Sequence, residues 1–250
     1  MGAHPRLTNP PITEALIDFR VRTSVEPNLT ELEKLCDELK SQFPVKKKNL
    51  KFSGAMKISA GDAADSKTDF RQWPVGFRLE TADGKRVAQL NLDSFTLSWL
   101  TPYDNWESLR DYTKPIWDSY RLAIEPEAVI RVAVRYINRI EIDLPMADFD
   151  NFLLAPPIVP RGLPQLVENF VTRVVVPLPS EHAHVIITQG SEAVDQGRAT
   201  LPIVIDVDAF KEDSFDPVGD TIWKTLEYLR TVKNDAFFGS VTAKALEKYK

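Results

Sequence analysis

The chain has 250 residues, of which 43% are hydrophobic and 27% are charged, so it can bury a substantial core. Its net charge of -5 argues against general polyanion binding, because such binding depends on many Lys and Arg side chains. A lone cysteine, Cys36, excludes an internal disulfide, and no apolar stretch approaches the roughly 20 residues that cross a bilayer. Residues 1–9 also lack the apolar core of a signal peptide, so we expect a cytoplasmic protein that acts away from membranes.

The first half of the chain is predicted to combine strands with two helices. Apolar and charged residues alternate over 13–22, as in a half-buried strand, and a capping box at Thr30 and Glu33 starts a helix that Pro44 ends. The turn Asp83-Gly84 is the clearest hairpin signal. The predicted order is a strand (13–22), a helix (30–43), strands at 51–59, 77–81 and 87–100 with a loop over 61–76, and a helix from Asp104 to Tyr120 that Pro115 kinks or breaks.

The second half is predicted to repeat this order with different side chains. A long strand over 130–142 leads to a short helix over 147–154 and a Pro-rich loop over 155–167. Three strands follow at 169–178, 183–189 and 201–208, and a helix starts near Asp220. Gly239 separates this helix from a final one that ends near Tyr249.

A short pattern occurs twice, about half the chain apart. Asp93-Ser94-Phe95 at a strand end precedes a helix with Trp106 and Leu109, and Asp208-Ala209-Phe210 precedes a helix with Trp223 and Leu226. The sequence therefore predicts two pseudo-repeat halves, 1–126 and 127–250, in one compact unit. The predicted fold is α+β: a duplicated strand, helix, three strands and helix that builds a curved antiparallel sheet with helices on one face. By analogy, this order is similar to the saddle-shaped, helix-grip class that includes TATA-binding protein.

The strand over residues 131–143 divides its side chains sharply between two faces. Its even positions are apolar except for Asn138, and its odd positions include Arg131, Arg135, Arg139 and Glu141. One interpretation is that the arginines pair across strands with carboxylates on an open sheet face. Those carboxylates would be Glu14, Asp18, Asp93, Asp206 or Asp208. The alternative is that the arginines bind a partner or an extended anion.

Other polar residues are first assigned structural roles. Asn138 should hydrogen-bond a helix end or a neighbouring backbone, Cys36 should pack in a helix, and the aromatic residues at helical spacing should form core. His182 and His184 share a strand face but lack further ligands, and Asp206, Asp208 and Asp93 are better explained as turn acceptors than as cation ligands. The basic run Lys46, Lys47, Lys48 and Lys51 is interpreted as a solvated connector. We predict no catalytic residue, metal site or cofactor.

Three segments together resemble a known family. They read PPITEA at 10–15, RYINRI at 135–140 and KNDAFFGSVT at 233–242. This combination is similar to a sporadically distributed family of uncharacterised bacterial proteins of about this length. The family has no assigned activity, so the resemblance implies no site residue, and its patchy distribution points to an accessory or defence system.

The functional expectation is a non-catalytic binding or protein-interaction module. It would use the charged sheet face, with Arg131, Arg135, Arg139, Asp18 and Glu141, and the loops at 61–76 and 155–167. The alternative is a carrier or enzyme for a small anionic ligand, with a pocket between the two halves where Arg135, Arg139, Asp18 and Glu141 would contact the ligand. Nucleic acid is disfavoured as a partner, because the chain is acidic and its basic run lacks interleaved aromatic residues.

Overall fold

The structure is a computed structural model that describes residues 4–24, 28–56, 68–146, 148–165, 167–192 and 199–250, with backbone alone for 53–56 and 68–71. The described part of the chain forms one sheet of nine strands in the order β2-β3-β4-β5-β1-β6-β9-β8-β7, and every neighbouring pair is antiparallel. The strands are β1 (Ile12–Arg22), β2 (Val45–Met56), β3 (Thr68–Glu80), β4 (Arg86–Asn91), β5 (Ser94–Leu100), β6 (Ala128–Asp143), β7 (Val171–Leu178), β8 (Ala183–Ser191) and β9 (Thr200–Phe215).

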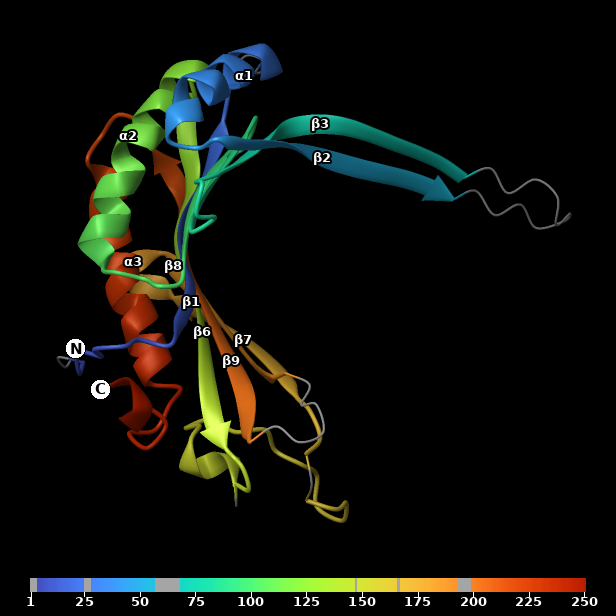
Figure 1. Cartoon of the computed structure of the whole chain (residues 1–250), viewed down its shortest axis with the longest axis vertical. Coiled ribbons are helices and arrows are strands. Elements are labelled where there is room, and N and C mark those ends of the chain that lie inside the picture. Colours follow the sequence, from blue (N-terminus) through green and yellow to red (C-terminus); the bar gives the residue numbers. More distant parts are fainter. Residues whose placement is uncertain (1–3, 25–27, 57–67, 147, 166, 193–198) are drawn as a thin grey trace, which may run out of the picture.

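The helices α1 (Leu29–Glu38), α2 (Trp106–Ile124) and α3 (Thr221–Phe238) lie on one face of this sheet and leave the other face open (Figure 1). The predicted α+β class is therefore confirmed. The first two helices start at asparagines rather than at the predicted caps: Asn28 accepts a hydrogen bond from the Thr30 amide, and Asn105 accepts one from the Ser108 amide. Asparagine is among the best N-cap residues, because its side-chain oxygen satisfies a free backbone N–H of the first turn.

The core lies between the helices and the apolar face of the central strands. The predicted core positions of β1 and β6 are all buried: Ala15, Ile17, Phe19, Val132, Val134, Tyr136, Ile140 and Ile142. Trp117 of α2 packs on Phe19 with ring centroids 4.6 Å apart, and on Phe95 at 5.5 Å. Burying a side chain of this kind stabilises the fold by roughly 1.5–3 kcal/mol, so the aromatic cluster fixes α2 to the sheet.

Several predicted elements have different limits in the structure. The expected strand over 87–100 is the hairpin β4–β5, because the chain turns at Leu92 and Asp93. Hydrogen bonds to the neighbouring strands hold this turn. The Leu92 amide donates to the Val75 carbonyl of β3, and the Val21 amide of β1 donates to the Asp93 carbonyl. Alternation alone does not separate one long strand from two short ones. The helix α2 continues through Pro115 without the predicted break, and Thr113, Ile116 and Trp117 beside this proline are buried.

Two predicted helices of the second half are wrong. The segment after β6 contains only a 3₁₀ turn at Phe149–Asn151, and residue 147 lies outside the described residues. After Gly239 the chain forms a β-bridge between Leu153 and Val241 and then a 3₁₀ turn at Glu247–Tyr249. The bridge explains the difference, because it holds the residues after α3 in an extended conformation.

The hairpin β2–β3 projects away from the sheet body (Figure 1). It contains the basic run, so the interpretation of these lysines as a connector is wrong: Lys46 pairs with Asp37 and Lys47 with Glu80, each at 2.8–2.9 Å. Of the loop predicted at 61–76, residues 68–76 belong to β3, and residues 61–67 lie outside the described residues. The run of lysines did not predict a strand, because β-propensity is low for Lys and pairing with β3 outweighs it.

The two halves share one topological feature. The first strand of each half pairs with the last strand of that half, β1 with β5 and β6 with β9, and β1 and β6 join the halves at the sheet centre. The repeated Asp-x-Phe pattern does not mark equivalent places, however. Phe95 is buried beneath α2, whereas Phe210 lies in mid-strand on the open face and stacks on His184. The first half also has one strand more than predicted.

No helix in the described ranges is long and apolar enough to cross a membrane.

Candidate functional site

The arginines of β6 lie on the open face of the sheet and are paired with carboxylates. Arg131 donates to Asp18 at 2.9 Å and to Asp208 at 2.8 Å, and Arg135 donates to Asp206 at 2.8 Å. The hydrogen bond that Arg135 donates to Asp206 raises the pKa of Arg135. These are the cross-strand ion pairs expected of an open sheet face.

The third arginine is paired in the same way. Arg139 contacts Glu141 on its own strand and donates to Glu192 at 3.1 Å, and Glu141 also accepts a hydrogen bond from Thr200 at 2.6 Å. The structure thus brings the five predicted binding residues onto one face. Their charges are largely matched there, because a carboxylate lies against each arginine.

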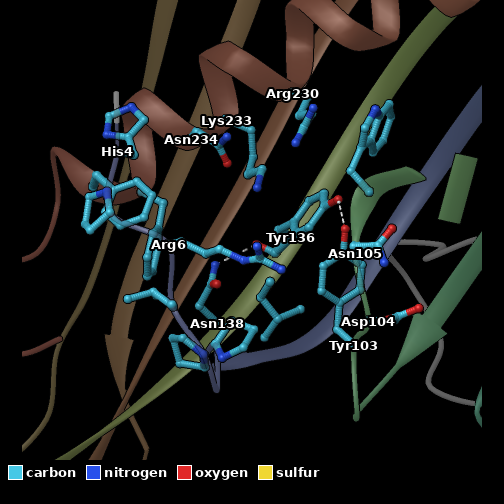
Figure 2. Close-up of a pocket in the computed structure, with 18 of the residues that line it drawn as sticks. His4, Arg6, Tyr103, Asp104, Asn105, Tyr136, Asn138, Arg230, Lys233 and Asn234 are labelled. Atoms are coloured by element: carbon cyan, nitrogen blue, oxygen red, sulfur yellow. Dashed lines mark hydrogen bonds between the residues drawn. The ribbon is translucent and has the colours of Figure 1, made fainter. Parts of the chain in front are cut away.

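A cavity of about 1210 Å³ lies on the opposite side, next to the helices and between the two halves (Figure 2). One wall of the cavity is the irregular segment that precedes β1. The other walls come from the start of α2, strand β6 and the end of α3. The residues that line it are His4, Pro5, Arg6, Leu7, Thr8, Pro10, Pro11, Ile12, Tyr103, Asp104, Asn105, Trp106, Glu107, Tyr136, Asn138, Arg230, Lys233, Asn234, Phe237 and Phe238. The volume suffices for a small ligand, since typical ligand sites hold roughly 300–1,000 Å³.

Lys233 is the most unusual residue of this cavity. Its side chain descends from α3 toward the sheet, and Nζ lies 3.6 Å from the centroid of the Tyr136 ring (Figure 2). The residue is only 8% exposed, yet within the described ranges no carboxylate lies within 4.0 Å of Nζ and no group hydrogen-bonds to it. Burial, together with the neighbouring Arg230, lowers the pKa of Lys233 to about 7.

Two tyrosines form the polar floor of the cavity beside this lysine. The hydroxyl groups of Tyr103 and Tyr136 are hydrogen-bonded at 2.8 Å, and burial raises the pKa of both, so both stay protonated near neutral pH. Asn138 next to them donates to the Ile205 carbonyl at 3.1 Å and to the Tyr136 carbonyl at 3.4 Å. The predicted role of Asn138 in holding a neighbouring backbone is confirmed, and its amide also lines the cavity.

Two further cations face the cavity. Arg230 projects from α3 one turn before Lys233 and approaches Glu107 at 3.5 Å and Glu227 at 3.6 Å. Arg6 reaches in from the segment before β1, toward Tyr136 and Asn138 (Figure 2). No ion pair of Arg6 occurs among residues that the structure describes. The cavity therefore collects three basic side chains, of which only Arg230 has carboxylate neighbours.

The N-terminal wall is attached to the last helix. The His4 ring nitrogen lies 2.6 Å from a carboxylate oxygen of Asp235, and the His4 ring stacks on Phe238 with centroids 4.5 Å apart. The Asn9 amide donates to the Tyr249 carbonyl at 3.3 Å. These contacts hold the segment that carries Arg6 across the mouth of the cavity.

The three segments that carry the family resemblance meet here. The first contributes Pro10, Pro11 and Ile12, the second Tyr136 and Asn138, and the third Lys233, Asn234, Phe237 and Phe238. The sequence predicted a pocket between the two halves as an alternative and named these segments, but none of the residues assigned to that pocket, Arg135, Arg139, Asp18 and Glu141, lines the cavity. A usable signal was present, because Lys233 falls four residues after the buried Leu229 in the apolar stripe of α3.

In the described part of the chain, the two histidines and the cysteine considered in the sequence do not form a binding site. His182 precedes β8 in a left-handed conformation, whereas His184 lies within β8 and stacks on Phe210, so the two do not share a strand face. Cys36 is buried as predicted, and burial raises the pKa of its thiol to about 11. No group of three His, Cys, Asp or Glu side chains suited to a metal ion occurs in the residues placed by the structure.

The chain matches no family model, and searches of the curated proteins and of the solved structures find no similar protein.

Proposed function

We propose that this protein binds a small anionic molecule in the cavity between its two halves. The observation that carries the proposal is Lys233, a buried cation that faces a cavity without a matching carboxylate. Burying an unpaired charge is costly, so proteins normally pair such a group or neutralise it. A bound anion would supply the missing partner.

The neighbours of Lys233 support an anionic rather than a neutral ligand. Arg6 and Arg230 keep their charge at any physiological pH and face the same space from opposite sides. The protonated hydroxyls of Tyr103 and Tyr136 and the amide of Asn138 add hydrogen-bonding groups on the floor. A carboxylate or a phosphate fits this set of donors.

The charged sheet face is the weaker candidate for binding. There, Arg131 and Arg135 already contact Asp18, Asp206 and Asp208, so a partner would have to replace existing ion pairs. The cavity offers basic groups that lack such partners. We therefore favour the ligand site over an interaction module that uses the sheet face.

A thermal-shift series tests the proposal. Small carboxylates and inorganic phosphate at 10 mM should raise the melting temperature of the protein, because a ligand at 100 times its Kd stabilises the folded state by about 2.7 kcal/mol. The Lys233→Met and Arg6→Gln variants should lose the shift. Lys224→Met, which removes an exposed lysine of the same helix, should keep it.

Two results would contradict the proposal. One is an unchanged melting temperature of the wild-type protein with every anion of the series. The other is an anion-dependent shift of equal size in wild-type protein and in Lys233→Met.

We also propose that the two halves derive from one duplicated unit, with the saddle-shaped sheet of the TATA-binding protein class. The pairing of the first and last strand within each half supports this, as does the helix that follows each last strand. On this view the cavity lies at the junction of the units, where their first strands, β1 and β6, run side by side.

A further inference from the structure

We propose that Lys233 is a reactive amine that condenses with the carbonyl group of an anionic ligand to form an imine. The inference rests on the proposed ligand site and names the class of its ligand: a small carbonyl compound that carries a carboxylate, such as a 2-oxo acid. It assigns to Lys233 a covalent role that simple binding does not require.

Lys233 lines the cavity, and its amine makes no competing polar contact among the described residues. Nζ lies over the Tyr136 ring at 3.6 Å and makes no hydrogen bond within the described ranges, so its lone pair is not engaged once the proton is lost. The cavity beside it is large enough for a small ligand. An ammonium that is tied to a carboxylate would be held charged and occupied, and Lys233 is not tied in this way.

The protonation state of Lys233 also favours attack on a carbonyl group. A lysine attacks a carbonyl only as the neutral amine, which an ordinary lysine scarcely populates at neutral pH. Burial and the positive charge of Arg230 lower the pKa of Lys233 to about 7, so a large fraction of the side chain is neutral there. Among the described residues, no carboxylate lies within 4.0 Å of Nζ to stabilise the charged form of Lys233. The carboxylates at the rim of the cavity, Asp104 and Glu107, are exposed.

The side chains around Lys233 can hold a ligand that has both a carboxylate and a carbonyl group. Arg6 and Arg230 can hold the carboxylate of the ligand while its carbonyl carbon faces Nζ. The hydroxyl pair of Tyr136 and Tyr103 lies at the edge of the ring over which Nζ sits, where it can give a proton to the carbonyl oxygen. This proton transfer assists the loss of that oxygen as water.

The step is balanced without any oxidant or reductant. The nitrogen lone pair attacks the carbonyl carbon and forms a C–N bond, which gives a carbinolamine. The carbinolamine then loses its oxygen as water, and a C=N bond remains. The tyrosine that gives a proton to this oxygen regains one from the nitrogen, so both protons of the water come from the amine overall. Water reverses the reaction, so the imine forms and breaks without net consumption of the protein.

Hydride trapping tests the inference. The full-length protein is incubated at pH 7.5 with 1 mM pyruvate and sodium cyanoborohydride, and the modified lysines are located by peptide mass spectrometry. We expect one added group per chain, on Lys233, with labelling at least tenfold above that of Lys224. Acetone at the same concentration, a carbonyl compound without a carboxylate, should label Lys233 at least tenfold less.

Lactate separates the imine proposal from the anion-site proposal, because it has the carboxylate of pyruvate but a hydroxyl in place of the keto group. If pyruvate and lactate both raise the melting temperature and pyruvate leaves no label on Lys233, the imine proposal fails and the anion site stands. If label is spread evenly over exposed lysines, the imine proposal also fails. If Lys233 is labelled equally by pyruvate and acetone and no anion shifts the melting temperature, the amine is reactive and the anion site fails.

Variants confirm the position of the amine. Lys233→Arg keeps a cation but has no nucleophilic amine, so it should lose the label. Should this variant fold poorly, the peptide map of the wild-type protein still decides the question, because it locates the label directly.

Discussion

The depressed pKa of Lys233 makes the stability of the protein depend on pH in a direction that can be measured. The folded-state pKa is about 7 and the ordinary lysine value is 10.5, so the unfolded chain binds more protons between these values. Stability must therefore rise with pH in this window. The penalty of burying the ammonium is fully present below pH 7 and is relieved as the pH rises above the folded-state pKa.

The Lys233→Met variant isolates this contribution, because methionine preserves the unbranched apolar stem and removes the charge. Integrating the proton uptake of one group with these two pKa values, the wild-type protein should gain about 1.4 kcal/mol relative to the variant between pH 6 and pH 8. Besides Lys233, the charged and titratable side chains that line the cavity are Arg6, Arg230, Tyr103, Tyr136, His4, Asp104 and Glu107, and the variant keeps all of them. The arginines and tyrosines do not change charge between pH 6 and 8.

The assay is urea unfolding of both proteins at pH 6, 7 and 8 in the same buffer system and ionic strength. The informative quantity is the difference in the free energy of unfolding between the two proteins at each pH. Lys224→Met is the matched control, and its difference from the wild-type protein should not vary with pH. A difference between wild type and Lys233→Met that is the same at all three pH values would refute the reasoning, because it would mean that Lys233 stays charged in the folded protein.

Two further predictions concern the core and the open face. Trp117→Ala should lower the free energy of unfolding by about 3–5 kcal/mol in urea titrations, because it removes a buried side chain from the centre of the aromatic cluster. A loss below about 1 kcal/mol would show that this cluster does not fix α2 to the sheet. Arg135→Gln should change the free energy of unfolding by less than about 1 kcal/mol, because its ion pair with Asp206 is partly solvated. The same variant should keep the anion-dependent thermal shift of the wild-type protein, and loss of that shift would place the ligand on the open face instead of in the cavity.

The sheet could be predicted from the sequence where alternation is strong. Strands β1 and β6 separate apolar from charged positions cleanly, and the predicted buried side chains are all buried. Pairing of the β6 arginines across strands was one of two interpretations, and Arg131 and Arg135 pair in this way. Both results follow from the two-residue period of a strand, which is a local property.

The elements that could not be predicted depend on contacts between distant segments. The turn at Leu92-Asp93 is fixed by hydrogen bonds to β3 and β1, and the extended chain after α3 is fixed by the Leu153–Val241 bridge. The repeated Asp-x-Phe pattern was misleading for a similar reason. Three matching residues do not determine which face of the sheet a side chain occupies, and Phe95 and Phe210 occupy opposite faces.

A pocket between the halves was an alternative prediction, but the residues that line the cavity were beyond reach of the sequence because they come from four separate segments. Arg6 and Lys233 stand near opposite ends of the chain, and nothing in local spacing indicates that they face one another. A lysine within an apolar stripe was the one local indication. Such a residue is more often explained by a side chain that extends along the helix to solvent.

The wall of the cavity has a consequence for biosynthesis. Residues 4–12 are synthesised more than 200 residues before residues 230–238, yet the two segments must touch before a ligand can be enclosed. A nascent chain therefore has no binding capacity until synthesis has passed α3. Truncated products that lack either segment would not bind the ligand, so occupancy of the cavity reports that translation and folding have both reached the end of α3.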